Sequence, residues 1–183
     1  MKKLTLIFYF FFILFPILNS SSNEIRNLDK LFLELSKTEN VDKADKLEKE
    51  IWAIWNWHPD DYQLTAKLEL GTRLMYDGDY DYALKVFNNV IVTDPQWSEA
   101  WNKRATLFFF MKNFQDSLKD IEVVLNLEPR HFGALSGQAQ IFIELKEYER
   151  ALDSLKKAKK IHPIIRGNKL IPEIEEIIKN QTI

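Results

Sequence analysis

The sequence predicts an all-α fold in which helical hairpins stack into an α-solenoid. Proline recurs at intervals of 34 residues, and apolar residues follow a helical period between the prolines. Because proline ends the helix that precedes it, a fixed spacing of prolines marks a repeated helical unit. The 183-residue chain also contains only five glycines and six prolines, which argues against a β-sandwich or barrel with many turns.

The composition is that of a globular protein, and it excludes several kinds of site. Apolar residues make up 46% of the chain and charged residues 28%, a balance that excludes disorder of the whole chain. The chain contains no cysteine, which excludes disulfides, cysteine-based zinc sites and iron–sulfur clusters. The net charge of -2 does not suggest binding to nucleic acid, and we expect no such partner.

The first 22 residues differ from the rest of the chain. Lys2 and Lys3 precede the uncharged residues 4–18, and a small polar segment follows and ends at Ser22. This layout is typical of a secretory signal peptide, and the apolar stretch is short for a membrane span. We therefore expect residues 1–22 to direct export and to be cleaved after Ser22 or Ser20. The alternative is an uncleaved membrane anchor, in which residues 4–18 alone would contact the membrane.

The repeated unit occurs three times, as residues 64–97, 98–131 and 132–165, with its proline at position 32. Small residues and aromatic residues recur in register between these units. Position 8 holds Gly71, Ala105 and Ala139, position 20 holds Ala83, Ser117 and Ala151, and position 17 holds Tyr80, Phe114 and Tyr148. Small side chains let two antiparallel helices approach closely, so each unit is expected to fold as a helical hairpin.

These columns resemble the tetratricopeptide repeat (TPR) family. The first unit matches the family pattern at Leu70, Gly71, Ala83, Phe87 and Pro95, the second at Trp101 and Pro129, and the third at Ala151, Ala158 and Pro163. The resemblance implies a right-handed superhelix of hairpins that is not an enzyme. It implies an adaptor or scaffold that binds a peptide or protein segment, of unknown identity, in a concave groove lined by the first helices.

The chain also resembles small exported TPR proteins of Gram-negative bacteria, through the runs 101–106 and 128–133. This likeness implies a periplasmic protein of the cell envelope. With residues 1–22 retained, the alternative is an inner-membrane-anchored assembly factor that displays the solenoid in the periplasm.

Helical segments are expected on both sides of the repeats. Residues 23–63 contain two apolar helical stripes, which predict a divergent N-terminal hairpin or cap in front of the first repeat. Residues 166–183 predict a last helix that covers the stacking face of the third repeat, because the end of a solenoid needs such a cap.

Candidate binding residues lie where the family resemblance places the wall of the groove. They are Thr72, Met75, Asn102, Lys103, Thr106, Phe109, Ser136, Gln140 and Ile143. The polar members can pair with a peptide backbone. The apolar members, Met75, Phe109 and Ile143, all stand at position 12, and they either contact the ligand or pack between helices.

One TPR subtype clamps the C-terminal carboxylate of chaperone tails with lysine, arginine and asparagine side chains. In this sequence those positions hold Leu68, Thr72, Lys103, Gly133 and Gly137. The clamp is therefore absent, and we do not expect a chaperone tail as the partner.

No catalytic residue, metal site or cofactor is expected. His58, His131 and His162 lie near prolines at helix ends and have no second ligand at a metal-binding spacing. Arg104 stands where the family has leucine, and a buried guanidinium needs a partner. We therefore expect a structural ion pair between Arg104 and Asp120 or Glu122.

Overall fold

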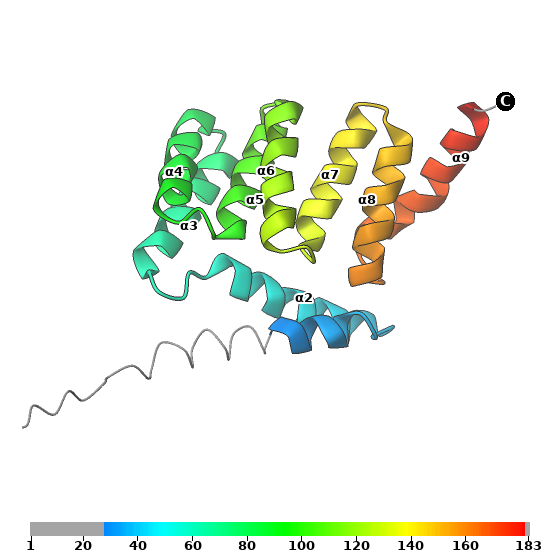
Figure 1. The fold of residues 1–183 in the computed structure, drawn as a ribbon, viewed down its shortest axis with the longest axis horizontal. Coiled ribbons are helices and arrows are strands. Elements are labelled where there is room, and N and C mark those ends of the chain that lie inside the picture. Colours follow the sequence, from blue (N-terminus) through cyan, green and yellow to red (C-terminus); the bar gives the residue numbers. More distant parts are fainter. Residues whose placement is uncertain (1–27, 182–183) are drawn as a thin grey trace, which may run out of the picture.

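The computed structural model describes residues 28–181, and within this range it contains helices and turns but no strand (Figure 1). A helical stretch at 28–35 precedes α2 (Val41–Asn56), α3 (Tyr62–Tyr76), α4 (Tyr80–Thr93), α5 (Ser98–Phe110), α6 (Phe114–Leu127), α7 (Phe132–Glu144) and α8 (Tyr148–Ile161). The 3₁₀ helix η1 (Arg166–Leu170) and α9 (Ile171–Gln181) end the described part. The expected signal peptide or anchor, residues 1–22, lies outside the described residues.

Three antiparallel hairpins, α3–α4, α5–α6 and α7–α8, stand side by side in an array (Figure 1). The prediction of an all-α solenoid is therefore confirmed. In each hairpin the turn contains one residue with positive φ, and the three are Gly78, Lys112 and Lys146. They occupy the same position of the 34-residue unit, so one turn geometry is used three times.

Close packing inside each hairpin explains the columns of small residues. A Cβ atom on Gly71 would lie 2.6 Å from the ring of Phe87 on the facing helix. The residues at the other crossing positions are all buried: Ala83, Ala105, Ser117, Ala139 and Ala151. A larger side chain at these positions would push the two helices apart.

The N-terminal hairpin takes a place that differs from the expectation. It does not stack in front of α3 as a preceding repeat would, but lies across the turns at one edge of the array (Figure 1). Leu35, Ile51 and Trp55 form one core with Phe132 at the start of α7. The elongated junction that joins α2 to α3 allows this change of direction, and the two tryptophans of α2 find apolar partners at this edge.

At the other end of the array, Ile171 and Ile174 pack into a core with Phe142 and Leu155. The segment η1–α9 therefore contacts α8, as a C-terminal cap would.

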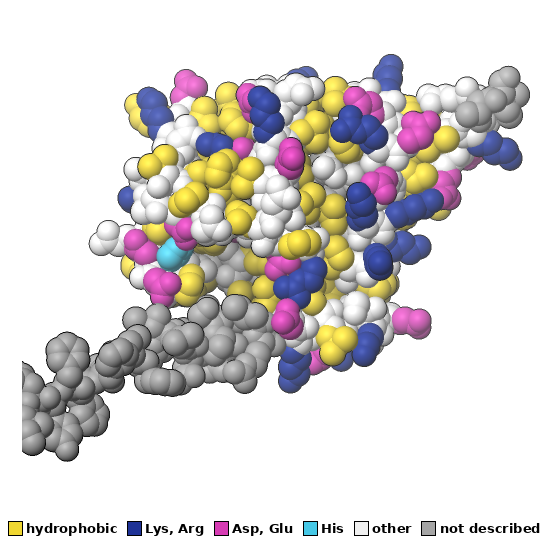
Figure 2. All heavy atoms as spheres, in the orientation of Figure 1, with side chains coloured by type: hydrophobic (Ala, Val, Ile, Leu, Met, Phe, Trp, Pro, Cys, Tyr) yellow, Lys and Arg dark blue, Asp and Glu magenta, His cyan; other side chains and the backbone are white. Residues whose placement is uncertain are grey.

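Among the described helices, none combines the length and the apolar character that crossing a membrane requires. On the face shown in Figure 2, acidic and basic side chains are interspersed, so no large area carries charge of one sign.

Candidate functional site: a groove closed by α2

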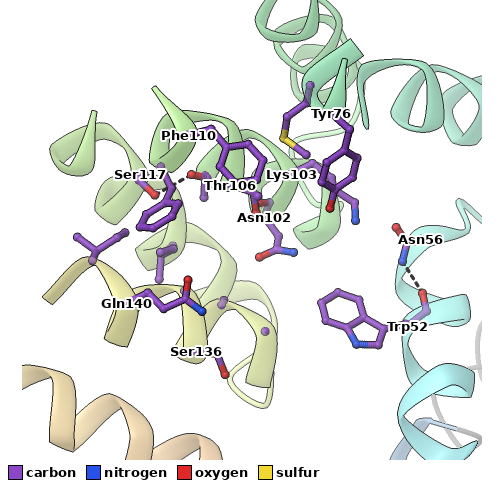
Figure 3. A pocket seen from close by; sticks show the side chains of 18 residues that line it. Trp52, Asn56, Tyr76, Asn102, Lys103, Thr106, Phe110, Ser117, Ser136 and Gln140 are labelled. Carbon is purple, nitrogen blue, oxygen red and sulfur yellow. Dashed lines mark hydrogen bonds between the residues drawn. The ribbon is translucent and has the colours of Figure 1, made fainter. Parts of the chain in front are cut away.

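A cavity of about 480 Å³ lies between α2 and the first helices of the three repeats. One wall is α2, which contributes Trp52 and Asn56, and the opposite wall comes from α3, α5 and α7 (Figure 3). Ser117 and Ile121 of α6 complete the lining. The volume falls within the range of about 300–1,000 Å³ that is usual for ligand-binding pockets.

The structure brings together seven of the nine candidate groove residues in this cavity. They are Met75, Asn102, Lys103, Thr106, Phe109, Ser136 and Gln140. The other two lie elsewhere. Thr72 borders a smaller neighbouring pocket with Leu68 and Glu69, and Ile143 packs against the core formed with Phe142 and Ile171.

The apolar residues at position 12 do not form one continuous strip. Met75 is only 1% exposed and belongs mainly to the core of the first repeat. Phe109 is half-buried and reaches both the cavity and the ring of Phe114, 5.8 Å away between centroids. Packing therefore dominates at Met75 and Ile143, and Phe109 is the member with a substantial face toward the groove.

Sequence reasoning missed the contribution of Trp52 and Asn56, because it placed the N-terminal hairpin in front of the array. Gly133 carried a signal of this contact. The first two repeats have Thr65 and Glu99 at the equivalent position, whereas a Cβ atom on Gly133 would lie 2.5 Å from the ring of Trp52. The missing side chain makes room for the tryptophan of α2.

A buried polar network lies beneath this wall. The carboxylate of Glu99 is fully buried and accepts hydrogen bonds from His131 Nε2 at 3.0 Å, Lys103 Nζ at 2.9 Å and Asn102 Nδ2 at 3.2 Å. His131 Nδ1 accepts from the backbone N–H of Ala134 at 3.0 Å. A neutral His131 ring therefore carries its proton on Nε2 and donates it to Glu99.

Burial by itself would raise the pKa of Glu99, but its partners have the larger effect. The hydrogen bond from His131 and the positive charge of Lys103 stabilise the ionised form, and the pKa of Glu99 is lowered. Lys103 also lies 5.7 Å from the ring centroid of Trp52. Asn102 and Lys103, expected as free groups on the groove floor, therefore also hold a buried carboxylate.

All three histidines pair with carboxylates that lie far away in the sequence. His58 contacts Asp94 at 2.8 Å, and His162 contacts Glu48 of α2 at 3.1 Å. The hydrogen bond from His162 lowers the pKa of Glu48 against the effect of burial. His131 stacks on Trp55 of α2 with ring centroids 4.0 Å apart. Two of these histidines thus attach α2 to the array, and no local spacing could have indicated their partners.

Arg104 forms its ion pair with Asp120, one of the two partners that the sequence suggested. Its Nε and Nη2 atoms each donate to the carboxylate of Asp120 at 2.8 Å. Its Nη1 atom donates to Asn88 of the preceding repeat at 2.7 Å. The guanidinium therefore links α5 to α6 and to α4, and it does not line the cavity.

Within residues 28–181, no group of three or more His, Asp or Glu side chains is arranged to hold a metal ion. The chemistry that the cavity offers is therefore that of its lining: aromatic rings, hydroxyls and side-chain amides. Such groups can hold an extended chain through apolar contacts and hydrogen bonds.

Comparisons with known proteins give a consistent picture. No protein-family model matches the chain. A TPR repeat-containing protein of Rhizobium etli is 40% identical over 144 residues, which are 74% of this chain and 69% of that protein. Sperm-associated antigen 1 of the rat is 27% identical over 148 residues, which are 80% of this chain but 16% of its own length.

Solved structures share the fold at low sequence identity. The first TPR of Spaghetti (RPAP3), bound to the HSP90 peptide SRMEEVD, aligns with a TM-score of 0.61 at 20% identity and covers 65% of this chain and 96% of that one. The Sgt2 TPR domain from Aspergillus fumigatus aligns with a TM-score of 0.62 at 13% identity, over 67% of this chain and 83% of that one. At these identities the likeness concerns the fold.

Proposed function

Because the chain belongs to the tetratricopeptide repeat family, we propose that it is a non-enzymatic adaptor that holds a peptide or protein segment in its groove. The observation that carries this proposal is the cavity of about 480 Å³ between α2 and the first helices. A structural neighbour of the same fold is bound to a peptide, which supports the same kind of ligand here.

The lining offers groups that can hold a peptide backbone. Gln140 is exposed at the cavity, and its amide both donates and accepts hydrogen bonds. Asn56 donates its amide to the carbonyl of Trp52 at 2.7 Å, which fixes its orientation. The hydroxyls of Thr106 and Ser136 donate to their own helices and keep lone pairs for a ligand.

The ligand of this groove is not a C-terminal carboxylate held by a clamp. Lys103 is the one lysine or arginine among the residues that line the described cavity, and its ammonium is bonded to Glu99 at 2.9 Å. A carboxylate clamp uses several cationic and amide side chains together, and Leu68 and Gly137 occupy two of those places. The groove is therefore suited to an internal segment of a protein.

The adaptor acts outside the cytoplasm, in the cell envelope. Support comes from the sequence of residues 1–22, with two lysines, an uncharged stretch and a small polar exit. The N-terminal sequence of the protein from envelope fractions tests this. A chain that starts at Ser21 or Asn23 indicates a cleaved periplasmic adaptor, and an intact N-terminus in membranes indicates an anchored assembly factor. Recovery in the cytoplasm would contradict both.

Photo-crosslinking tests where a ligand binds. Binders are selected from a random peptide library with the purified protein, and a photo-crosslinking residue replaces Gln140 in the groove. A matched variant carries the same residue at Gln115, an exposed position on α6 outside this cavity. The proposal predicts crosslinks from Gln140 and background from Gln115. Failure to select any binder, or equal crosslinking at both positions, would contradict it.

A further inference from the structure

We propose that the groove selects its segment through one bulky, uncharged apolar side chain. This side chain enters the cavity between Trp52 of α2 and the aromatic rings of α3 and α5. The inference rests on the proposed function, because it assumes that a segment binds in the groove, and it adds what kind of segment binds.

The first observation is an exposed aromatic rim. Tyr76 is 72% exposed and Phe110 39% exposed, and both border the cavity. The two rings lie 6.2 Å apart between centroids, and Phe109 lies 6.3 Å from Phe110. Contiguous exposed apolar surface of this kind is typical of a binding site, and aromatic rings are enriched in protein interfaces.

The second observation is a hollow at Gly137 of α7, in the wall of the cavity that faces α2. The first two repeats have the long side chains of Glu69 and Lys103 where the third has Gly137. A Cβ atom on Gly137 would meet one atom, Ile121 Cδ1, at 4.0 Å. The fold therefore leaves space above Gly137, and the small side chains of Ala134 and Ser136 line the cavity from the same helix.

The third observation concerns charge. The cavity lining contains no carboxylate, and its one ammonium, on Lys103, is already bonded to the buried Glu99. A charged side chain that entered the cavity would lose its hydration without finding a counter-ion, which is costly. An aliphatic or aromatic side chain meets no such cost, and its burial is favourable.

Trp52, in the wall formed by α2, is held in place before any ligand binds. The ring of Trp52 contacts the rings of Trp55 and Phe132 with centroids 5.2 and 5.6 Å away, and its Nε1 donates to Glu48 at 3.3 Å. A preformed wall costs little ordering when the ligand binds. Trp52 is therefore a specificity-determining residue of the groove.

A matched pair of substitutions at Gly137 tests the inference. The full-length protein is used to select binders from a random peptide library, and their affinities are measured by fluorescence anisotropy. Gly137→Leu fills the hollow, whereas Gly137→Ala adds a single carbon and leaves most of it open. We expect Gly137→Leu to weaken binding by about tenfold or more, and Gly137→Ala to change it by less than about threefold. Unfolding curves of both variants verify that they fold.

The selected peptides provide the second readout. We expect them to share one aromatic or large aliphatic side chain, whose replacement by aspartate or alanine reduces affinity by about tenfold or more. Amidation of the peptide C-terminus should leave affinity unchanged. If the peptides crosslink from Gln140 but share an acidic side chain, the inference is wrong and the proposed function stands. If they require a free C-terminal carboxylate, both the inference and the assignment of an internal segment are wrong, and only the binding of a peptide in the groove stands. If no peptide reaches the groove, the proposed function itself is wrong.

Discussion

Glu99 is the residue at which three parts of the molecule meet. It belongs to α5, its partner His131 caps the N-terminus of α7, and the histidine ring stacks on Trp55 of α2. A buried carboxylate is tolerated only while its hydrogen-bonding partners remain. The network therefore couples the ionisation of Glu99 to the attachment of α2 to the repeats.

Removal of one partner tests this coupling. His131→Phe keeps an aromatic ring beside Trp55 but removes the hydrogen bonds to Glu99 and from Ala134. We expect the free energy of unfolding, measured with urea, to fall by about 2–4 kcal/mol. In the control, His131→Phe is combined with Glu99→Leu, and the loss should be smaller than the sum of the single changes. Additive losses would contradict the coupling.

Asn102 and Lys103 illustrate why groove residues cannot be altered freely. Both donate to Glu99, so replacement of either one removes a partner from a buried charge. We expect Lys103→Met to lower the free energy of unfolding by about 1–3 kcal/mol, because the burial of Glu99 is then less compensated. An unchanged unfolding curve would contradict this, because it would mean that His131 and Asn102 alone compensate the burial of the Glu99 carboxylate. Gln140 is the better position for probing the groove.

The carboxylates of Glu99 and Glu48 make stability depend on pH. Both have a folded-state pKa below the ordinary value of 4.5. Their contribution to folding is therefore fully present above pH 4.5 and is lost as the pH falls through the lowered pKa. We expect the free energy of unfolding to decrease below pH 4.5, with a shallower decrease in Glu99→Gln and Glu48→Gln. An unchanged slope in both variants would contradict this assignment.

At the scale of the elements, the turns inside the hairpins repeat one backbone geometry with two kinds of residue. Gly78 has a φ of 84°, whereas Lys112 and Lys146, at the equivalent position, both have a φ of 58°. A side chain at positive φ costs about 1–2 kcal/mol, and glycine avoids most of that cost but adds freedom to the unfolded chain. We expect Lys112→Gly and Lys146→Gly each to raise the free energy of unfolding by up to about 1 kcal/mol. Gly78→Lys is the reverse control and should lower it.

The contact between α2 and α7 can be tested with two glycines one helical turn apart. Gly133→Ala places a Cβ atom 2.5 Å from the ring of Trp52, whereas the Cβ atom of Gly137→Ala makes one ordinary contact, with Ile121 Cδ1 at 4.0 Å. We expect the first change to lower the free energy of unfolding by about 1–3 kcal/mol. The second should raise it by up to about 1 kcal/mol, because alanine favours the helix. Equal effects of the two changes would argue against α2 lying on α7.

At the scale of the whole molecule, the repeats could be predicted from sequence because their contacts are local and recur. The proline spacing and the small residues at positions 8 and 20, which are Gly71 and Ala83 in the first unit, are sufficient to define each hairpin. The place of α2 could not be predicted in this way. Its partners Phe132 and His162 are distant in sequence, and an apolar stripe on a helix does not say which surface will cover it. The family resemblance identified most of the candidate residues that line the groove, but it did not identify Trp52.

One consequence of this arrangement concerns the free end of the array. Because α2 crosses the edge of the repeats, it does not cover the stacking face of α3 and α4 (Figure 1). Leu70 is 42% exposed there, whereas the equivalent Arg104 of the second repeat contacts α4 through its hydrogen bond to Asn88. The N-terminal hairpin thus shapes the groove instead of extending the solenoid.

The most direct test of ligand binding in this groove uses the indole N–H groups of the five tryptophans. Among them, Trp52 alone lines the described cavity. A nitrogen-15 NMR spectrum is recorded while a selected peptide is added, with the Trp52 signal assigned through Trp52→Phe. The account predicts that the Trp52 signal shifts until the peptide saturates, while that of the exposed Trp57 stays in place. A saturating peptide that moves other indole signals and leaves Trp52 unchanged would contradict it.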